Sequence, residues 1–73
     1  MPKLGVFSGE EIARILEAGG FVRARQMGSH LIMQKWTVSG TVTVPVPLHR
    51  TVRIGTLQCI IRQSGLPREH FLV

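Results

Sequence analysis

The sequence predicts an α+β fold in the order α-β-β-β-α, in which two helices cover one face of a three-stranded antiparallel sheet. Three observations support this prediction. Apolar residues recur at helical spacing near both ends of the chain, and three strand-like stretches lie between them. The connections between these stretches are short, so consecutive strands pair as an antiparallel meander. The two amphipathic helices then need one apolar sheet face to cover.

The first helix is expected to begin just after Ser8. The segment Ser8-Gly9-Glu10-Glu11 has the form of a capping box, in which the serine hydroxyl and the Glu11 carboxylate each accept a backbone N–H at the helix start. Phe7 and Ile12 have the spacing of a hydrophobic staple across that start. Gly19-Gly20 is expected to end the helix.

Three strands are expected over residues 21–26, 30–36 and 41–46. Met27-Gly28 is expected to turn the chain between the first two. The second strand has apolar residues on both parities, which leaves its inward face ambiguous. Pro45 has no N–H to donate, so the third strand is expected to lie at a sheet edge or to stop there. The face opposite the helices would carry arginine, lysine, threonine and, as one candidate, His30.

A second helix is expected from about Ile54, after a loop over residues 47–53. Gly65 is the expected left-handed residue at its end, and Pro67 prevents its continuation before a final turn at residues 68–71. Cys59 falls among the apolar residues of this helix and is expected to be a small core residue.

The composition indicates one basic domain over residues 1–73. Nine lysines and arginines stand against four acidic residues, which gives a formal charge of +5 and favours a polyanionic partner. Acidic proteins and anionic membrane surfaces attract the same charge. The single cysteine forms no internal disulfide, and no signal peptide or membrane-spanning run is evident, so the expected compartment is the cytoplasm, without a membrane partner.

The candidate chemistry centres on His30, at the start of the second strand. Imidazole titrates near neutrality, so it can take a proton from a ribose 2′-hydroxyl or give one to a leaving oxygen. The alternative is an ordinary surface histidine. Arg23, Arg25 and Lys35 are expected to attract phosphate, because none has an obvious local carboxylate partner; their alternative is a solvated face.

Other chemistry finds little support in the sequence. The cysteine and the three histidines do not have the spacing of metal ligands, so no metal or cofactor is expected. The aromatic residues are few, and base stacking is not expected to be the main binding device. Leu31, Met33 and Trp36 either form an exposed apolar patch for a protein partner or belong to the core.

Three segments, taken together, resemble the HicA-type (YcfA-like) toxin family. They are Arg25-Gln26-Met27-Gly28-Ser29-His30, Thr41-Val42-Thr43-Val44-Pro45-Val46-Pro47-Leu48-His49 and the stretch from Ile54-Gly55-Thr56-Leu57 through Gly65-Leu66. The resemblance implies a fold like that of double-stranded-RNA-binding domains. It also implies activity as an mRNA interferase, and inhibition by a HicB-type antitoxin.

The same resemblance assigns the catalytic role to His30, from the Gly-Ser-His motif, and points to His49 in the Val-Pro-x-His position. The sequence departs from the commoner pattern at Leu31, where a second histidine is frequent, and at Cys59, where serine is common. His49 is therefore either the second proton-transfer group or phosphate contact, or a loop histidine that hydrogen-bonds near the third strand.

These inferences lead to one hypothesis and one alternative. The hypothesis is a metal-independent mRNA endoribonuclease that leaves a cyclic phosphate and a 5′-hydroxyl. The alternative is a catalytically silent module of the same fold that binds RNA or an antitoxin. A homo-oligomer and a toxin–antitoxin hetero-oligomer are both compatible with the sequence.

Overall fold

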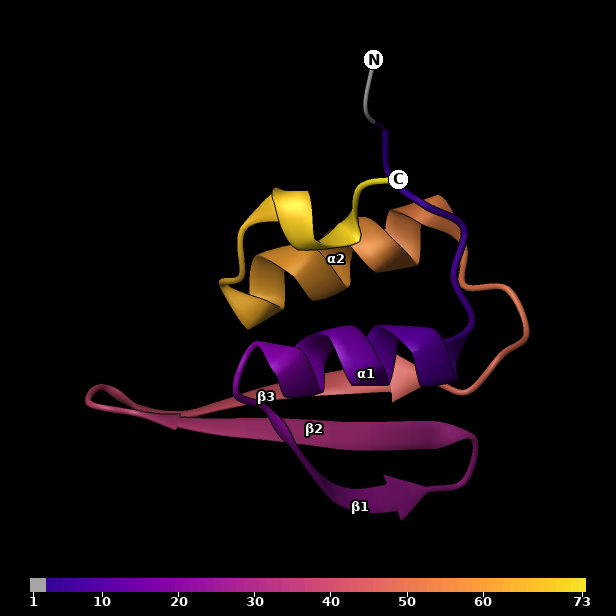
Figure 1. Cartoon of the computed structure of the whole chain (residues 1–73). Coiled ribbons are helices and arrows are strands. Elements are labelled where there is room, and N and C mark those ends of the chain that lie inside the picture. The colour runs from indigo at the N-terminus through magenta and orange to yellow at the C-terminus, as the bar shows by residue number, and fades with distance from the viewer. Residues whose placement is uncertain (1–2) are drawn as a thin grey trace.

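The elements follow one another in the predicted order in a computed structural model, which describes residues 3–73. They are α1 (Gly9–Ala18), β1 (Val22–Met27), β2 (His30–Thr37), β3 (Gly40–Pro47), α2 (Ile54–Ser64) and the short 3₁₀ helix η1 (Arg68–Phe71). The strands form one antiparallel sheet in the order β1-β2-β3, and both α-helices lie on one side of it (Figure 1). The predicted α+β fold is therefore confirmed, including the position of the Pro45 strand at a sheet edge.

Local features explain where α1 begins and where α2 ends. The Ser8 N–H donates to Glu11 Oε1 at 2.9 Å, and the Glu11 N–H donates to Ser8 Oγ at 3.1 Å, so the predicted capping box is present. At the end of α2, Gly65 adopts the left-handed conformation with φ 70°, which a residue with a β-carbon rarely adopts. The first turn of α2 is different, because Arg53 at its N-cap makes no side-chain capping bond.

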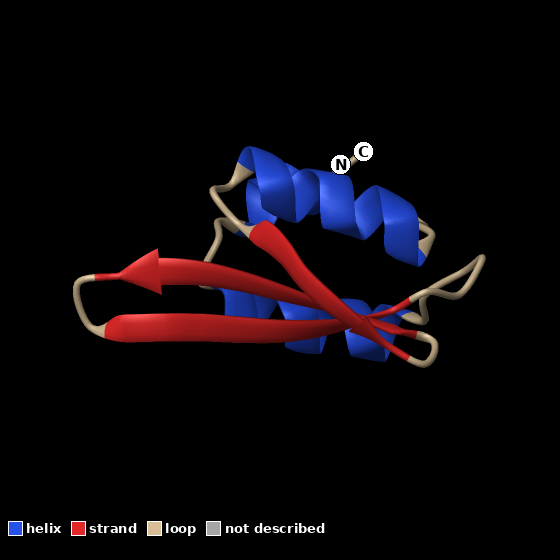
Figure 2. Cartoon of the chain, turned by 90° about the horizontal axis from the view of Figure 1, so that it is seen from below, coloured by secondary structure: helices blue, strands red, loops and turns tan. Residues whose placement is uncertain are grey.

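Two tight turns join the strands. β1 extends to Met27, and the turn is formed by Gly28 and Ser29, with Gly28 at φ 61°. The β2–β3 turn is held by Thr37, whose Oγ1 donates to the Gly40 carbonyl at 2.8 Å and accepts from the Ser39 N–H at 3.2 Å. These turns set the register of the sheet, and the β2–β3 hairpin extends past the helices (Figure 2).

The core lies between the helices and one sheet face, which we call the inner face. The sheet contributes Leu31 and Met33 from β2, which settles the ambiguous orientation of that strand. The whole buried apolar cluster comprises Ile12, Ala13, Leu16, Phe21, Leu31, Met33, Val44, Val46, Val52, Leu57, Ile60 and Phe71. Full burial of one such leucine or isoleucine contributes about 1.5–3 kcal/mol.

The opposite side of the sheet is the outer face. Alternation along β2 and the regular register with β3 place these residues on it: Arg25 of β1, His30, Ile32, Gln34 and Trp36 of β2, and Thr41, Thr43 and Pro45 of β3. Trp36 is 67% exposed there, whereas Leu31 and Met33 are buried. The three residues therefore form neither a common patch nor a common core, because the alternation of the strand separates Trp36 from the other two.

A β-bulge interrupts β1 between Arg23 and Arg25. Arg25 pairs with Ile32 of the outer face, whereas Arg23 pairs with Met33 of the inner face, and the residue between them has no partner on β2. The two-residue period of the sequence, in which Phe21, Arg23 and Arg25 alternate with Val22, Ala24 and Gln26, predicts that Arg23 and Arg25 share one face, and this prediction is wrong. The extra residue shifts the alternation by one position and sends the two side chains to opposite sides.

Candidate active site

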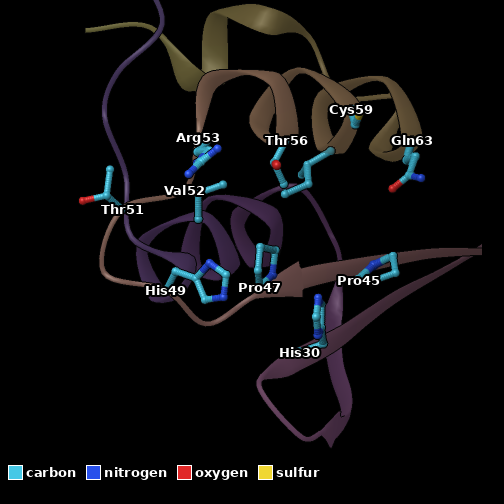
Figure 3. A pocket seen from close by; sticks show the side chains of 11 residues that line it. His30, Pro45, Pro47, His49, Thr51, Val52, Arg53, Thr56, Cys59 and Gln63 are labelled. Carbon is cyan, nitrogen blue, oxygen red and sulfur yellow. The ribbon is translucent and has the colours of Figure 1, made fainter.

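An open pocket of about 570 Å³ lies along the β3 edge of the sheet, and α2 forms its opposite wall (Figure 3). His30 and His49 both line it. The full lining is His30, Pro45, Pro47, His49, Thr51, Val52, Arg53, Thr56, Cys59, Ile60 and Gln63. The structure thus brings together the two histidines that the sequence analysis singled out.

The backbone of His30 is fixed on both sides. It follows the tight Gly28-Ser29 turn and is paired with Met27 of β1 and with Pro47 of β3. Its side chain is exposed, and no hydrogen bond to it occurs among residues 3–73. Both ring nitrogens are therefore free to contact a substrate from a rigid position.

The loop that carries His49 is fastened at three points. The Leu48 N–H donates to the Ser29 carbonyl at 2.7 Å, next to His30. The His49 carbonyl accepts from the Gly9 N–H at 2.9 Å, and the Val52 N–H donates to the Phe7 carbonyl at 2.8 Å. These bonds tie the loop to the β1–β2 turn and to the start of α1. His49 is therefore positioned by the same turn that positions His30.

Gly9 is a positioning residue that the sequence analysis treated only as part of the capping box. A β-carbon at this position would lie 2.1 Å from the Pro47 carbonyl oxygen and 2.8 Å from Leu48 Cα. Both atoms belong to the backbone and cannot rotate away. Glycine is required here because α1 begins directly against the end of β3, which leads into the His49 loop.

The electrostatic character of the pocket suits an anion. All four acidic residues of the chain are glutamates of α1 and η1, and none of them lines the pocket. The pocket instead contains Arg53 and the two histidines. The first turn of α2 has no acidic residue and no side-chain cap, so its N–H groups and the positive end of the helix dipole are not neutralised locally.

Only one of the three expected phosphate-binding residues is free of an internal partner. Arg23 forms hydrogen bonds to the carboxylates of Glu10 and Glu17, so the expectation that it has no carboxylate partner is wrong. These bonds, the Glu10 bond above all, raise the pKa of the Arg23 guanidinium, and Arg23 in turn lowers the pKa of Glu10. The Arg25 side chain makes no hydrogen bond within the described chain and points to the outer face.

Lys35 is also engaged, although not by a carboxylate. Its Nζ donates to the Gly19 carbonyl at 3.0 Å and lies 5.9 Å from the centroid of the Phe21 ring. Lys35 therefore caps the C-terminal end of α1 from the inner face of the sheet. The β1 bulge and the alternation of β2 thus separate Lys35 and Arg23 from Arg25, and the RNA contacts of all three stay predictions.

α2 contributes polar side chains that the sequence analysis missed. Thr56, Cys59 and Gln63 line the pocket at positions i, i+3 and i+7, a spacing that places them on one helix face. Cys59 is exposed, so its expected place in the core is wrong, and its Sγ accepts a hydrogen bond from Arg62 Nη2 at 3.3 Å. This polar face could have been identified from the sequence, because Thr56, Cys59 and Gln63 recur at helical spacing and are offset by one position from the buried Leu57 and Ile60.

Among residues 3–73, no three histidine, cysteine, aspartate or glutamate side chains gather as a group able to hold a metal ion. No helix in the same range has both the length and the apolar character required to cross a membrane.

Comparison with known proteins identifies the family. No curated protein sequence matches the chain. A family model described as "HicA toxin of bacterial toxin-antitoxin" matches residues 9–66. The matched span runs from the first residue of α1 to just beyond α2, so it includes the whole sheet and both pocket histidines. The chain therefore belongs to the HicA toxin family of bacterial toxin–antitoxin systems.

Proposed function

We propose that this protein is a toxin ribonuclease that cuts mRNA without a metal ion, with its reaction in the pocket between β3 and α2. One observation carries the proposal: His30 and His49 line the same pocket, and no carboxylate does. Membership of a toxin family supports an RNA target and a protein antitoxin. We propose a HicB-type antitoxin as that partner.

The proposed chemistry is an internal transesterification. The ribose 2′-oxygen attacks the adjacent phosphorus, and the bond from phosphorus to the 5′-oxygen breaks. One neutral imidazole takes the 2′-hydroxyl proton, and one imidazolium gives a proton to the leaving 5′-oxygen. The products are a 2′,3′-cyclic phosphate and a 5′-hydroxyl. His30 is assigned one of these roles because its position on β2 is rigid, and His49 is the candidate for the other.

The remaining pocket groups would hold the phosphate. Arg53 supplies a cation, and the uncapped first turn of α2 supplies backbone N–H donors. On the outer face, Arg25 would attract the neighbouring phosphates of the strand. Because no carboxylate lies in the pocket, these groups would meet no competing anion from the protein itself.

The experiment compares His30→Ala, His49→Ala and His70→Ala in single-turnover cleavage of RNA with a chelator present. His70 is the matched control, because it is exposed on η1 and does not line the pocket. His30→Ala should lower the rate about 10²- to 10⁴-fold, the usual contribution of one general acid or base. Thermal melting and RNA affinity should stay close to those of the parent protein.

The outcome for His49 distinguishes its two roles. A loss comparable to that of His30→Ala makes His49 the second proton-transfer group, and a smaller loss makes it a phosphate contact. Cyclic phosphate at the 3′ ends of the products would support the transesterification. The mechanism is wrong if a folded His30→Ala protein cuts at the parental rate.

A further inference from the structure

Trp36 lies on the same face of the same strand as His30. It is 67% exposed, and it lies on the outer face, whereas both α-helices lie on the other side of the sheet (Figure 1). The register between β2 and β3 is regular from His30 to Thr37, so no bulge interrupts the alternation between the two residues. Six residue-to-residue steps along the strand separate them, which corresponds to about 20 Å at about 3.3 Å per step.

The surface between His30 and Trp36 carries no negative charge. Its polar side chains have exposed apolar neighbours on β1, where Met27 pairs with His30 and Val22 pairs with Gln34. Ile32 is only 7% exposed, and its neighbours in register are Arg25 and Pro45. Further along β2, Gln34 Nε2 donates to Thr43 Oγ1 at 3.4 Å. The four glutamates are all in α1 and η1, on the helical side of the sheet. A polyanion could therefore follow β2 without meeting a carboxylate.

These features favour a nucleic acid strand over a protein at Trp36. An exposed indole beside uncharged polar groups, on a face that also carries Arg25, can stack on a nucleobase of any sequence, because every base has a flat aromatic face. The cross-strand partner of Trp36 is Thr41, and the adjacent outer-face position on β3 is Thr43. Apolar side chains are exposed nearby as well, at Val22 and Val38, so the preference for a nucleic acid rests on charge: Arg25 lies on this face and no carboxylate does.

We propose that Trp36 stacks on an unpaired base of the RNA strand whose scissile phosphate lies at His30, so that the substrate is single-stranded along β2. This inference rests on the proposed function and specifies its substrate class. The base must be unpaired, because base faces in a duplex are already stacked on one another. At the 3.4 Å spacing of a stacked strand, about 20 Å corresponds to about six nucleotides, and to fewer when the strand is extended.

The first experiment uses the intrinsic fluorescence of Trp36, the single tryptophan of the chain. The probe is an RNA of eight nucleotides with 2′-O-methyl groups, which cannot be cut because the attacking hydroxyl is blocked. Titration with this single strand should quench the fluorescence of Trp36. The same strand annealed to its complement should quench it far less.

The second experiment compares Trp36→Leu, Trp36→Phe and Val38→Ala by anisotropy of the labelled 2′-O-methyl strand. Trp36→Leu should weaken binding roughly 5- to 150-fold, the loss expected for one stacked base. Trp36→Phe should restore most of the affinity because it keeps an aromatic face. Val38 is a fully exposed apolar residue at the same hairpin end, so Val38→Ala should bind like the parent protein. In cleavage assays, Trp36→Leu should raise KM and leave kcat close to that of the parent protein.

Three results would overturn the proposal. They are parental affinity in Trp36→Leu, equal quenching by the duplex and the single strand, and protection of Trp36 by the antitoxin but not by RNA. In the last case the residue belongs to a protein interface, and Val38→Ala should then weaken antitoxin binding too. Different results would refute the proposed function. They are absent cleavage by the parent protein and undiminished cleavage by His30→Ala, and both are independent of the quenching result.

Discussion

Gly9→Ala tests whether the contact between α1 and the end of β3 positions the active site. The added β-carbon would lie 2.1 Å from the Pro47 carbonyl oxygen, whereas Cβ atoms in proteins essentially never come closer than 3.0 Å to a non-bonded heavy atom. The helix start and the strand end would therefore have to separate by about 0.9 Å, the difference between the two distances. The hydrogen bond from the Gly9 N–H to the His49 carbonyl spans the same contact.

Two opposing effects on stability can be weighed for this substitution. Alanine is favoured over glycine within a helix by about 1 kcal/mol, which alone would stabilise the protein. Overpacking against an unyielding backbone costs about 1–3 kcal/mol, so we expect net destabilisation. We also expect a large loss of cleavage rate, because a displacement of about 1 Å in an active site can lower the rate about 10²-fold.

Gly55→Ala is the matched control for stability. Gly55 is in the first turn of α2, its φ is not positive, and a β-carbon there would meet nothing within 4 Å. Only the helix propensity applies, so this variant should be stabilised by up to about 1 kcal/mol. Urea unfolding would measure both variants, and single-turnover cleavage at saturating protein would compare Gly9→Ala with the parent protein. A Gly9→Ala protein with unchanged or higher stability and parental cleavage would refute the positioning argument.

Two further predictions concern the arginines of β1. Arg25→Ala should reduce the slope of log affinity for single-stranded RNA against log salt by about 0.7, the value for one neutralised phosphate. Arg23→Ala should leave this slope unchanged and lower the unfolding free energy, because Arg23 binds Glu10 and Glu17; the opposite pattern in salt titrations would contradict both assignments. The second prediction is a pH dependence. Because Arg23 lowers the pKa of Glu10 from 4.5, the stability from this pair is complete above about pH 4.5 and is lost as the pH falls through the lowered pKa. The urea midpoints of the parent protein and Arg23→Ala should therefore differ at pH 7 and converge in acid, and a constant difference between them would show that the pair does not act through Glu10.

The secondary structure was predictable because its signals are local. The capping box at Ser8 and the left-handed Gly65 each depend on a few neighbouring residues, and both are present as expected. Pro45 indicated an edge strand because it lacks an N–H, and β3 is at the edge. Each of these signals acts within one turn or one strand, so no knowledge of distant contacts was required.

The candidate site was predictable only in part. The family motifs indicated His30 and His49, but their common pocket depends on the loop bonds to Ser29 and Gly9, which join segments far apart in sequence. Cys59 was misplaced although the helical period argues against its burial. It lies two positions after the buried Leu57, which is about 200° around an α-helix.

The β1 bulge is the feature that alternation alone could not predict, and it determines how charge is distributed on the two faces. Without the extra residue, Arg23 and Arg25 would share a face. With it, Arg23 turns to α1, where it binds Glu10 and Glu17, while Glu11 caps the helix. Three of the four carboxylates are therefore engaged in holding α1 in place, and Arg25 is left on a face without negative charge. The same local irregularity that stabilises the packing of α1 on the sheet thus leaves the outer face positive beside the two-histidine pocket.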